Sequence, residues 1–245
     1  MADLANQGRV SQHGGRIGIS VFFPCYNEQD NLSRVVRSAL EVLETIRADY
    51  EVIIIDDGST DRTGQVAEDL ASGNPRIRVV HHQKNLGYGA ALRSGFAAAT
   101  KDLVFFADAD GQFDLRDLPA FLAQIDQADV VCGYRLRRSD SLIRRLNGWC
   151  WTRLVCAVFG FDVKDVDCGF KLFRRHVVDG MEMLSTGALI SAEILARARR
   201  AGYRIIQLPV RHYPRKAGRQ TGASPKVILK AFKELWHLHR LIAGR

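Results

Sequence analysis

Acidic and amide side chains follow short apolar runs at three places in this sequence. The three clusters are Pro24-Cys25-Tyr26-Asn27-Glu28, Asp56-Asp57-Gly58-Ser59-Thr60-Asp61 and Asp108-Ala109-Asp110-Gly111-Gln112. In the third cluster two carboxylates stand two residues apart, so in an extended segment they point the same way. Together with the amide oxygen of Gln112 they offer the hard oxygen ligands that Mg²⁺ and Mn²⁺ prefer. We therefore predict Asp108, Asp110 and Gln112 as ligands of a divalent metal that also binds a diphosphate.

The first two clusters carry side chains suited to a nucleotide. Asp57 can accept hydrogen bonds from a base or a ribose, Tyr26 can pack on a base, and Glu28 can accept from a sugar or a base. The alternative for the acidic clusters is a solvated turn whose aspartates cap helices. For the second cluster we expect both, with Asp61 or Thr60 capping the next helix and Asp57 binding.

Apolar periodicity predicts that strands and helices alternate along the first half of the chain. The expected strands span 17–23, 52–55, 77–80, 103–107, 130–132 and 203–210, and the expected helices span 32–46, 60–71, 89–99, 191–201, 226–242 and a segment around Trp149 and Trp151. The basic run 135–145 is expected to be a loop. This alternation implies an α/β fold with a mainly parallel sheet and helices on both faces. In such sheets ligands bind beyond the carboxyl ends of the strands, where the clusters lie.

Size and composition fit one α/β domain. The chain has 245 residues, of which 47% are hydrophobic and 25% charged, as in ordinary globular proteins. We expect a loose tail over 1–16, a catalytic domain over 17–224 and an amphipathic helix over 225–245.

Five cysteines without a C-x-x-C pair favour reduced thiols and a cytosolic protein. No secretory signal opens the chain, and no apolar stretch approaches the ~20 residues of a membrane span.

The formal net charge of +8 predicts an anionic partner, such as a phosphate, nucleic acid or anionic lipid. No DNA-reading motif is found, and acidic clusters at the site oppose a polyanion, so a nucleic-acid-binding module is disfavoured. A cluster of arginines precedes the two tryptophans and consists of Arg135, Arg137, Arg138, Arg144 and Arg145. Guanidinium groups grip phosphate and tryptophan favours membrane interfaces. We predict that a lipid phosphate enters here and binds Arg144 and Arg145; the alternative is a solvated charge run.

The last predicted helix has two unlike faces. Its basic face carries Lys226, Lys230, Lys233, His237 and Arg240, and its opposite face carries Ile228, Ala231, Phe232, Leu235 and Ile242. Such a helix can lie flat on anionic lipid. It can equally pack on the domain with its basic side in water.

The motifs P-x-Y-N-E, D-D-G-S-x-D-x-T and D-A-D-G-Q, in this order, resemble the inverting glycosyltransferases of family 2, which have the GT-A fold. The resemblance runs from about Ile17 to Arg240 and is closest to polyprenyl-phosphate sugar transferases, such as dolichyl-phosphate mannosyltransferases. It implies nucleotide contacts at Pro24, Tyr26, Glu28, Ile55 and Asp57, and metal or diphosphate contacts at Asp108, Ala109, Asp110 and Gln112.

Three further segments resemble family motifs. Gly133-Tyr134-Arg135 is similar to a Gly-x-Arg motif, which implies that Arg135 faces phosphate. Arg215-Lys216-Ala217-Gly218 is similar to an Arg-x-x-Gly loop, which implies that Arg215 closes over the donor. Asp167-Cys168-Gly169-Phe170-Lys171 matches a third. Relatives often have a lysine three residues after the glycine of the Arg-x-x-Gly loop, where this sequence has Thr221. Many relatives continue into membrane-spanning helices, which we do not expect in this sequence.

The resemblance implies transfer of a hexose from a nucleotide diphosphate sugar, GDP-mannose or a UDP-sugar, to a polyprenyl or dolichyl phosphate on the cytoplasmic face of a membrane. We hypothesise a direct displacement in which the metal, bound at Asp110, and Arg135 and Arg215 stabilise the departing charge. A phosphate monoester has a second pKa near ~6 and is already a nucleophile at neutral pH. A hydroxyl acceptor, on a glycan or glycolipid, would need a base, for which Asp167 is the candidate; otherwise Asp167 orients the acceptor.

Two other functions are less consistent with the sequence. A nucleotidyltransferase usually has a Gly-rich basic loop after its first strand, where this chain has Pro24 to Glu28. A protein that binds the donor without turnover would not need the intact acidic clusters. The sequence leaves open a membrane-protein partner and a homo-oligomer.

Overall fold

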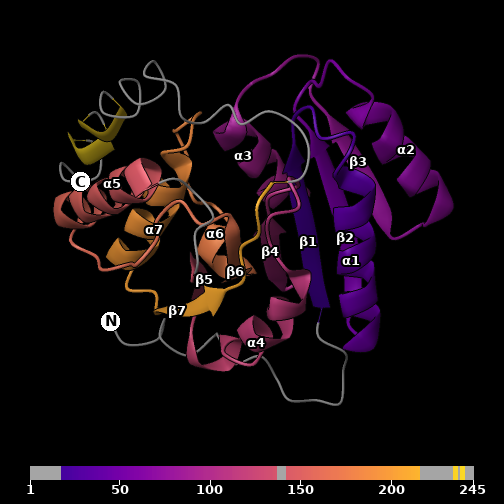
Figure 1. Ribbon diagram of the computed structural model, residues 1–245. Coiled ribbons are helices and arrows are strands. Elements are labelled where there is room, and N and C mark those ends of the chain that lie inside the picture. The colour runs from indigo at the N-terminus through magenta and orange to yellow at the C-terminus, as the bar shows by residue number, and fades with distance from the viewer. Residues whose placement is uncertain (1–17, 137–141, 216–233, 237, 241–245) are drawn as a thin grey trace.

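A computed structural model describes residues 18–136, 142–215, 234–236 and 238–240 of the chain, with side chains described from 145 onward in the second range. The chain folds around one seven-stranded sheet with the order β3-β2-β1-β4-β6-β5-β7 and with helices on both faces (Figure 1). This architecture confirms the predicted α/β class. The tail predicted over 1–16 lies outside the described residues.

All neighbouring strands pair in parallel except β6, which is antiparallel to both β4 and β5. The strands are β1 Gly18–Cys25, β2 Asp49–Asp56, β3 Ile77–His81, β4 Leu103–Ala107, β5 Val130–Arg135, β6 Phe170–Arg174 and β7 Ile205–Val210. The sequence pattern missed β6, because its lysine and arginine resemble loop residues although all five of its residues are buried.

Four helices, α3, α5, α6 and α7, pack on one face of the sheet, and α1, α2 and α4 pack on the other. The helices are α1 Leu32–Thr45, α2 Thr63–Gly73, α3 Tyr88–Ala98, α4 Leu118–Leu122, α5 Leu142–Phe159, α6 Arg175–Val178 and α7 Ile190–Arg200. The prediction of a loop over 135–145 was wrong in its second part, because α5 begins at Leu142. None of the helices described here combines the length and the hydropathy that a membrane span requires.

The predicted C-terminal helix is described only at 234–236 and 238–240, which are helical. There Leu235 and Leu238 are buried in the same core cluster as α5 and α7. Arg240, from the predicted basic face, is exposed. This short part therefore packs on the domain, and the rest of 226–242 lies outside the described residues.

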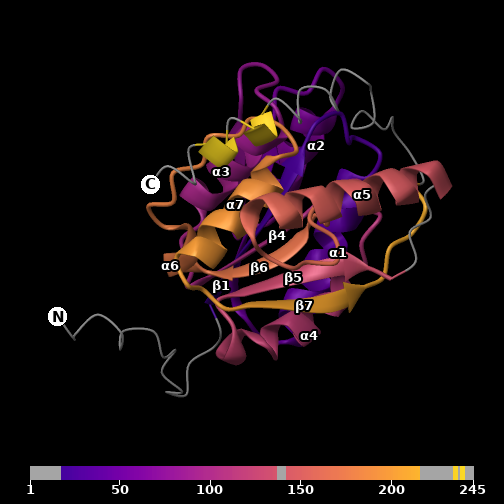
Figure 2. The same cartoon turned by 90° about the vertical axis from the view of Figure 1, so that its left-hand side faces the viewer.

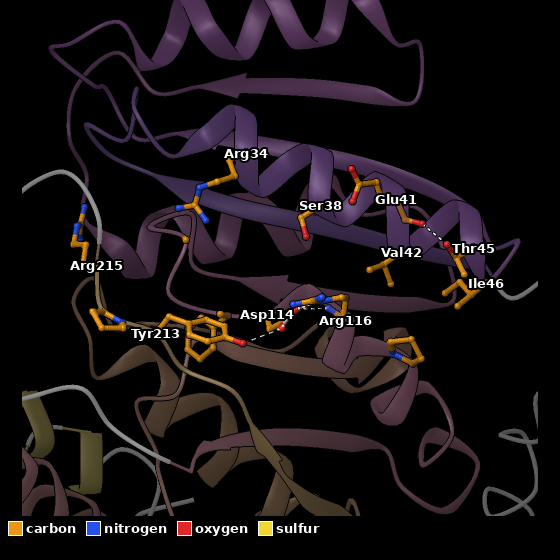
Figure 3. Close-up of a pocket in the computed structure, with 14 residues that line it drawn as sticks. Arg34, Ser38, Glu41, Val42, Thr45, Ile46, Asp114, Arg116, Tyr213 and Arg215 are labelled. Carbon is orange, nitrogen blue, oxygen red and sulfur yellow. Dashed lines mark hydrogen bonds and ion pairs between the residues drawn. The ribbon is translucent and has the colours of Figure 1, made fainter.

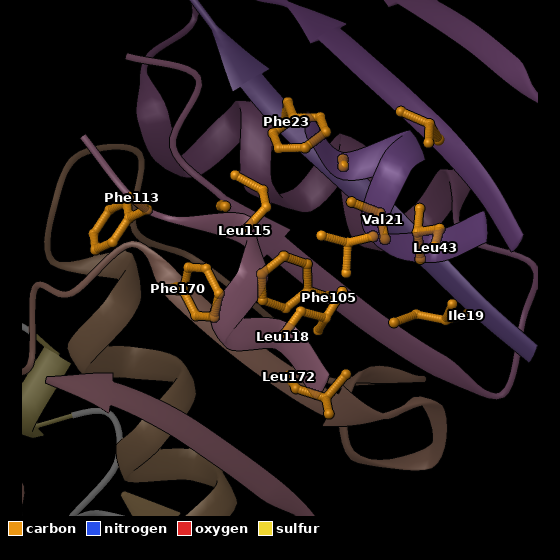
Figure 4. Packing of buried hydrophobic residues seen from close by; sticks show 14 of the residues in the cluster. Ile19, Val21, Phe23, Leu43, Phe105, Phe113, Leu115, Leu118, Phe170 and Leu172 are labelled. Carbon is orange, nitrogen blue, oxygen red and sulfur yellow. The ribbon is translucent and has the colours of Figure 1, made fainter. Parts of the chain in front are cut away.

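Packed phenylalanines hold the central strands together. Phe105 of β4 and Phe170 of β6 lie with ring centroids 4.6 Å apart (Figure 4). On the opposite face, the rings of Phe22 and Phe96 are 5.1 Å apart, and a Cβ at Gly95 would overlap the Phe22 ring. The glycine thus lets α3 approach β1 closely.

The antiparallel strand β6 brings another segment to the edge of the sheet that carries the acidic clusters. The last residue of β4, Ala107, pairs with the first residue of β6, Phe170. The segment before β6 therefore reaches the same edge of the sheet as the acidic cluster after β4. The backbone N–H of Asp108 donates to the carbonyl of Gly169 at 3.1 Å and fixes this contact.

Candidate active site

The three predicted clusters meet at the carboxyl edge of β1, β2 and β4. The loop after β1 is joined to the loop after β2 by hydrogen bonds from Asn27 N to Ser59 Oγ (3.0 Å) and from Glu28 N to Thr63 Oγ1 (2.8 Å). Asp61 accepts from the backbone N–H of Thr63 at 2.9 Å, although the N-cap position of α2 itself is Arg62, whose side chain makes no capping hydrogen bond. These bonds confirm that the side chains after β1 and β2 lie side by side.

Two carboxylates follow β4 in an environment that disfavours their charge. Burial, and then the charge of Asp110, raise the pKa of Asp108 from 3.8 to about 7, although Tyr88, Lys171 and Arg135 oppose the rise. The hydroxyl of Tyr88 donates to Asp108 Oδ1 at 2.9 Å. Burial also raises the pKa of Asp110. The pair therefore stores unfavourable charge that a bound cation would relieve.

This donor set fits a divalent ion that is shared with a substrate. Within the described part of the chain, no three His, Cys, Asp or Glu side chains are grouped so as to hold a metal. Two carboxylates suffice where substrate phosphates and water complete the coordination of Mg²⁺. The Nε2 of the third predicted ligand, Gln112, donates to the Tyr213 carbonyl at 3.0 Å, which leaves its Oε1 as the atom able to face an ion.

Arg215 closes one side of the acidic pair. Its guanidinium forms an ion pair with Glu28, and its Nη1 lies 3.8 Å from Asp110 Oδ2. The chain before it is held in place because Tyr213 N donates to the carbonyl of Gln112 at 2.8 Å. Burial raises the pKa of Glu28, whereas Asn31 and Arg215 lower it. The arginine predicted to cover the donor thus lies at the edge of the sheet that carries Asp108 and Asp110.

Asp57 organises a loop in this structure. Its carboxylate is 3% exposed and accepts from the backbone N–H groups of Leu86 and Gly87, both at 2.9 Å. His82 Nδ1 lies 2.6 Å from Asp57 Oδ1, and the Nε2 of the same ring lies 2.8 Å from Ser94 Oγ. The nucleotide contact expected of Asp57 stays a prediction, and it requires an acceptor lone pair beyond those bonds.

The other residues predicted to contact the nucleotide differ in how far their side chains are exposed. Pro24 and Ile55 pair across β1 and β2 and are buried. The side chain of Ile55 has no exposed surface and packs in the core, so only its backbone can meet a ligand. Ala109 is also buried. Tyr26 is 38% exposed, which leaves its ring free to stack on a base.

The Arg135 guanidinium is held by a partner that the sequence did not suggest. Asp165 accepts from Arg135 Nε at 2.6 Å and from Nη2 at 2.8 Å in a bidentate pair. Nearby, burial and the charge of Asp165 raise the pKa of Asp167, which also accepts from the indole of Trp151. Asp167 therefore has a carboxyl group that holds its proton more tightly than a carboxyl group in water does.

Lys171 of β6 stabilises the segment that carries Asp165 and Asp167. It is 1% exposed, and its Nζ donates to the carbonyls of Val166, at 3.2 Å, and Cys168. Its charge lowers the pKa of both Asp108 and Asp167. The sequence pattern gave no signal for this role beyond the motif that ends at Lys171.

The profile described as glycosyl transferase family 2 matches residues 20–181. The chain belongs to glycosyltransferase family 2. Among solved structures, it resembles the glucosyl-3-phosphoglycerate synthase of Mycobacterium tuberculosis in complex with Mn²⁺ and uridine-diphosphate-glucose, with a TM-score of 0.71, 23% identity, and coverage of 94% of this chain and 80% of that one. The same enzyme in complex with phosphoglyceric acid gives a TM-score of 0.70, 23% identity, and coverage of 94% and 81%. These likenesses confirm the GT-A fold.

In this family 2 glycosyltransferase a pocket of about 480 Å³ opens beside Arg135. It is lined by Tyr134, Arg135, Leu136, Arg145, Gly148, Trp149, Lys164 and Asp165. Lys164 Nζ lies 4.3 Å from the centroid of the Tyr134 ring. Arg145 therefore lines the same pocket as Arg135, and its contact with an acceptor phosphate stays a prediction, whereas the side chain of Arg144 lies outside the described residues.

A larger groove of about 760 Å³ runs along α1 (Figure 3). Arg34 and Arg215 lie at one end of it and Ile46 at the other. Gly111 also lines the groove with φ +72°, and a Cβ there would overlap the Arg34 guanidinium. The turn between Asp110 and Gln112 therefore needs glycine both for its backbone and for its contact with α1.

Proposed function

We propose that this family 2 glycosyltransferase is metal-dependent and moves a hexose from a nucleotide diphosphate sugar to a polyprenyl phosphate, with inversion. The observation that carries the proposal is the half-buried pair Asp108 and Asp110, with Arg215 beside Asp110 and with Arg135, which shares a pocket with Arg145, close enough to lower the pKa of both carboxyls. An anionic donor and an anionic acceptor would meet where the two cationic regions flank the pair.

On the donor side, Asp108 and Asp110 would hold Mg²⁺ or Mn²⁺. Such an ion supplies charge neutralisation for the departing diphosphate. Arg215 would exchange Glu28 for a diphosphate oxygen, and Tyr26 would stack on the base. A solved relative binds Mn²⁺ with uridine-diphosphate-glucose, which favours a UDP-sugar over GDP-mannose as the first donor to test.

On the acceptor side, the pocket of about 480 Å³ suits a phosphate group. Arg145 would grip it, and Arg144 precedes Arg145 on the same helix. Arg135, held rigid by Asp165, would contribute a fixed positive charge between the pocket and the carboxylate pair. A phosphate nucleophile needs no base, because its second pKa is near ~6.

A hydroxyl acceptor is the second candidate, and Asp167 favours it. Burial raises the pKa of Asp167, which makes its carboxylate a stronger base than one in water. A solved structure of similar fold is in complex with phosphoglyceric acid, which supports testing a small phosphorylated acceptor. Asp167→Asn separates the two candidates, since it would abolish transfer to a hydroxyl and leave transfer to a phosphate nearly intact.

The test is a panel of nucleotide sugars in a thermal-shift assay with Mn²⁺, followed by mass spectrometry of products. Polyprenyl phosphate and 3-phosphoglycerate would be supplied as acceptors in separate reactions. The proposal expects a polyprenyl-phosphate hexose that forms with the wild type and not with Asp110→Ala. If hexosyl phosphoglycerate were the sole product, the acceptor would be phosphoglycerate and not the lipid. If no donor gave any product, the enzyme assignment would be refuted.

We also propose that the protein works at the cytoplasmic face of a membrane without crossing it. The net charge of +8 favours an anionic surface. All five cysteines are free thiols, as suits a reducing compartment. A membrane-protein partner or a homo-oligomer stays a prediction.

A further inference from the structure

Helix α5 is only partly packed on the protein. It has 18 residues, and the buried ones among its described side chains are Thr152, Val155 and Cys156. The outer face of α5 consists of Leu146, Trp149, Cys150, Arg153, Leu154 and Ala157, all exposed and recurring at intervals of three, four and seven. Leu146 is 60% exposed and Trp149 57% exposed. Large apolar side chains gathered in this way indicate a binding surface.

All charged residues of α5 are basic. Its sequence, LIRRLNGWCWTRLVCAVF, has three arginines and no acidic residue. Arg145 borders the outer face and Arg153 lies on it, with its guanidinium 6.0 Å from the centroid of the Trp149 ring. Arg153 pairs with Asp162 at 3.5 Å, and the Asp162 side chain is 87% exposed, so this ion pair is weak. Basic and apolar groups together on a helix surface match the interface of an anionic bilayer.

The outer face of α5 is continuous with the proposed acceptor pocket. Trp149 lines that pocket and is also exposed on the outer face. Leu136, 60% exposed, lines the same pocket from the end of β5. A lipid whose phosphate lies beside Arg135 and Arg145 would therefore leave the pocket between apolar side chains. Figure 2 shows α5 outside the strands, on the face of the sheet opposite α4.

We infer that the outer face of α5 docks the enzyme on an anionic phospholipid bilayer, so that the acceptor pocket opens at the lipid headgroups. This inference rests on the proposed function for the role of docking, but the docking itself needs neither donor nor acceptor. It differs from tethering by the predicted C-terminal helix, because it assigns the contact to Leu146, Trp149 and Leu154.

The first experiment is sedimentation of the protein with vesicles of phosphatidylglycerol and phosphatidylcholine, without substrates. Leu146→Ser with Leu154→Ser removes apolar contacts and is expected to weaken binding at least about tenfold. Arg153→Gln is expected to weaken it about fivefold at low salt. The matched control is Arg37→Gln on α1, an exposed arginine away from this face, which is expected to bind as the wild type does. Equal binding by all four proteins would overturn the inference.

The second experiment locates the contact by quenching tryptophan fluorescence with brominated lipid. Trp149→Phe is expected to remove most of the quenching, and Trp236→Phe, which replaces a 62% exposed tryptophan of the C-terminal segment, is expected to retain it. The reverse result would transfer docking to the C-terminal helix and refute the inference. A change from dimer to monomer in Leu146→Ser, without vesicle binding by the wild type, would show that a second copy covers this face and would refute it too.

The two proposals fail separately. Vesicle binding that depends on α5, in a protein that glycosylates only a soluble acceptor, would reject the lipid acceptor and keep the docking surface. Transfer to a detergent-solubilised polyprenyl phosphate, by a protein that does not sediment with vesicles, would reject the docking surface alone.

Discussion

Replacing Asp108 by asparagine should make the protein more stable while destroying its metal site. The folded protein raises the pKa of this carboxyl from 3.8 to about 7, mainly through burial and then through Asp110. Because one pKa unit is worth about 1.4 kcal/mol, holding the ionised form in the folded state costs roughly 4 kcal/mol above pH 7. The asparagine side chain has a similar shape and no charge, so it removes this cost.

The stabilisation expected of Asp108→Asn depends on pH. A carboxyl group whose pKa is raised by folding destabilises the fold as the pH rises from its unfolded pKa to its folded pKa. The advantage of Asp108→Asn should therefore vanish near pH 4, grow between pH 4 and 7, and stay constant above 7. For a chain of this size roughly 4 kcal/mol corresponds to a Tm increase on the order of 10 °C.

The assay is thermal unfolding in EDTA at several pH values, repeated with Mn²⁺ and a nucleoside diphosphate. The exposed Asp69→Asn is the control, and its stability should change by less than ~0.5 kcal/mol at any pH. Adding the metal and the nucleotide should raise the Tm of the wild type and leave that of Asp108→Asn unchanged. A variant as stable as the wild type at pH 8 in EDTA would refute the account of buried charge at this site.

Three further substitutions test other parts of the site and fold. Gly169→Ala should weaken Mn²⁺-dependent nucleotide binding at least about tenfold by calorimetry, because the new Cβ overlaps the Asp108 carboxylate; unchanged affinity would contradict this packing. Lys171→Met should lower the free energy of unfolding in urea by about 1–3 kcal/mol, since two buried carbonyls lose their donor; no loss would contradict it. His81 has a pKa raised above 6.5, first through its hydrogen bond to Glu68. Its contribution is complete below pH 6.5 and is lost as the pH rises through the folded pKa, so His81→Gln should lower the Tm at pH 6 more than at pH 9; a pH-independent effect would contradict this.

The sequence was sufficient to predict the parallel half of the sheet. Each apolar run of β1, β2 and β4 ends at a polar cluster, and parallel strands bring their carboxyl ends to one edge. The positions of Asp108, Asp110 and Glu28 followed from this rule alone. Burial of α1 through Leu32, Val35 and related positions also followed, because helical periodicity reflects packing on a sheet.

The rest depends on contacts that no local pattern encodes. Strand β6 is hidden in the sequence because Lys171 is buried with its charge satisfied by carbonyl groups. The Arg215–Glu28 pair joins residues 187 positions apart. Asp165 could be recognised as the partner of Arg135 only once the segment before β6 is known to reach this edge. The same holds for His82, which two hydrogen bonds fix between Asp57 and Ser94.

The most direct test of the central claim is a calorimetric titration of a uridine or guanosine diphosphate sugar into the wild type and Asp110→Ala, with Mn²⁺ and with EDTA. The account predicts that the wild type binds one of these donors tightly only when Mn²⁺ is present, and that Asp110→Ala shows no gain from the metal. Equal binding in EDTA, or a full Mn²⁺ effect in Asp110→Ala, would contradict a metal bridge between this carboxylate pair and the diphosphate.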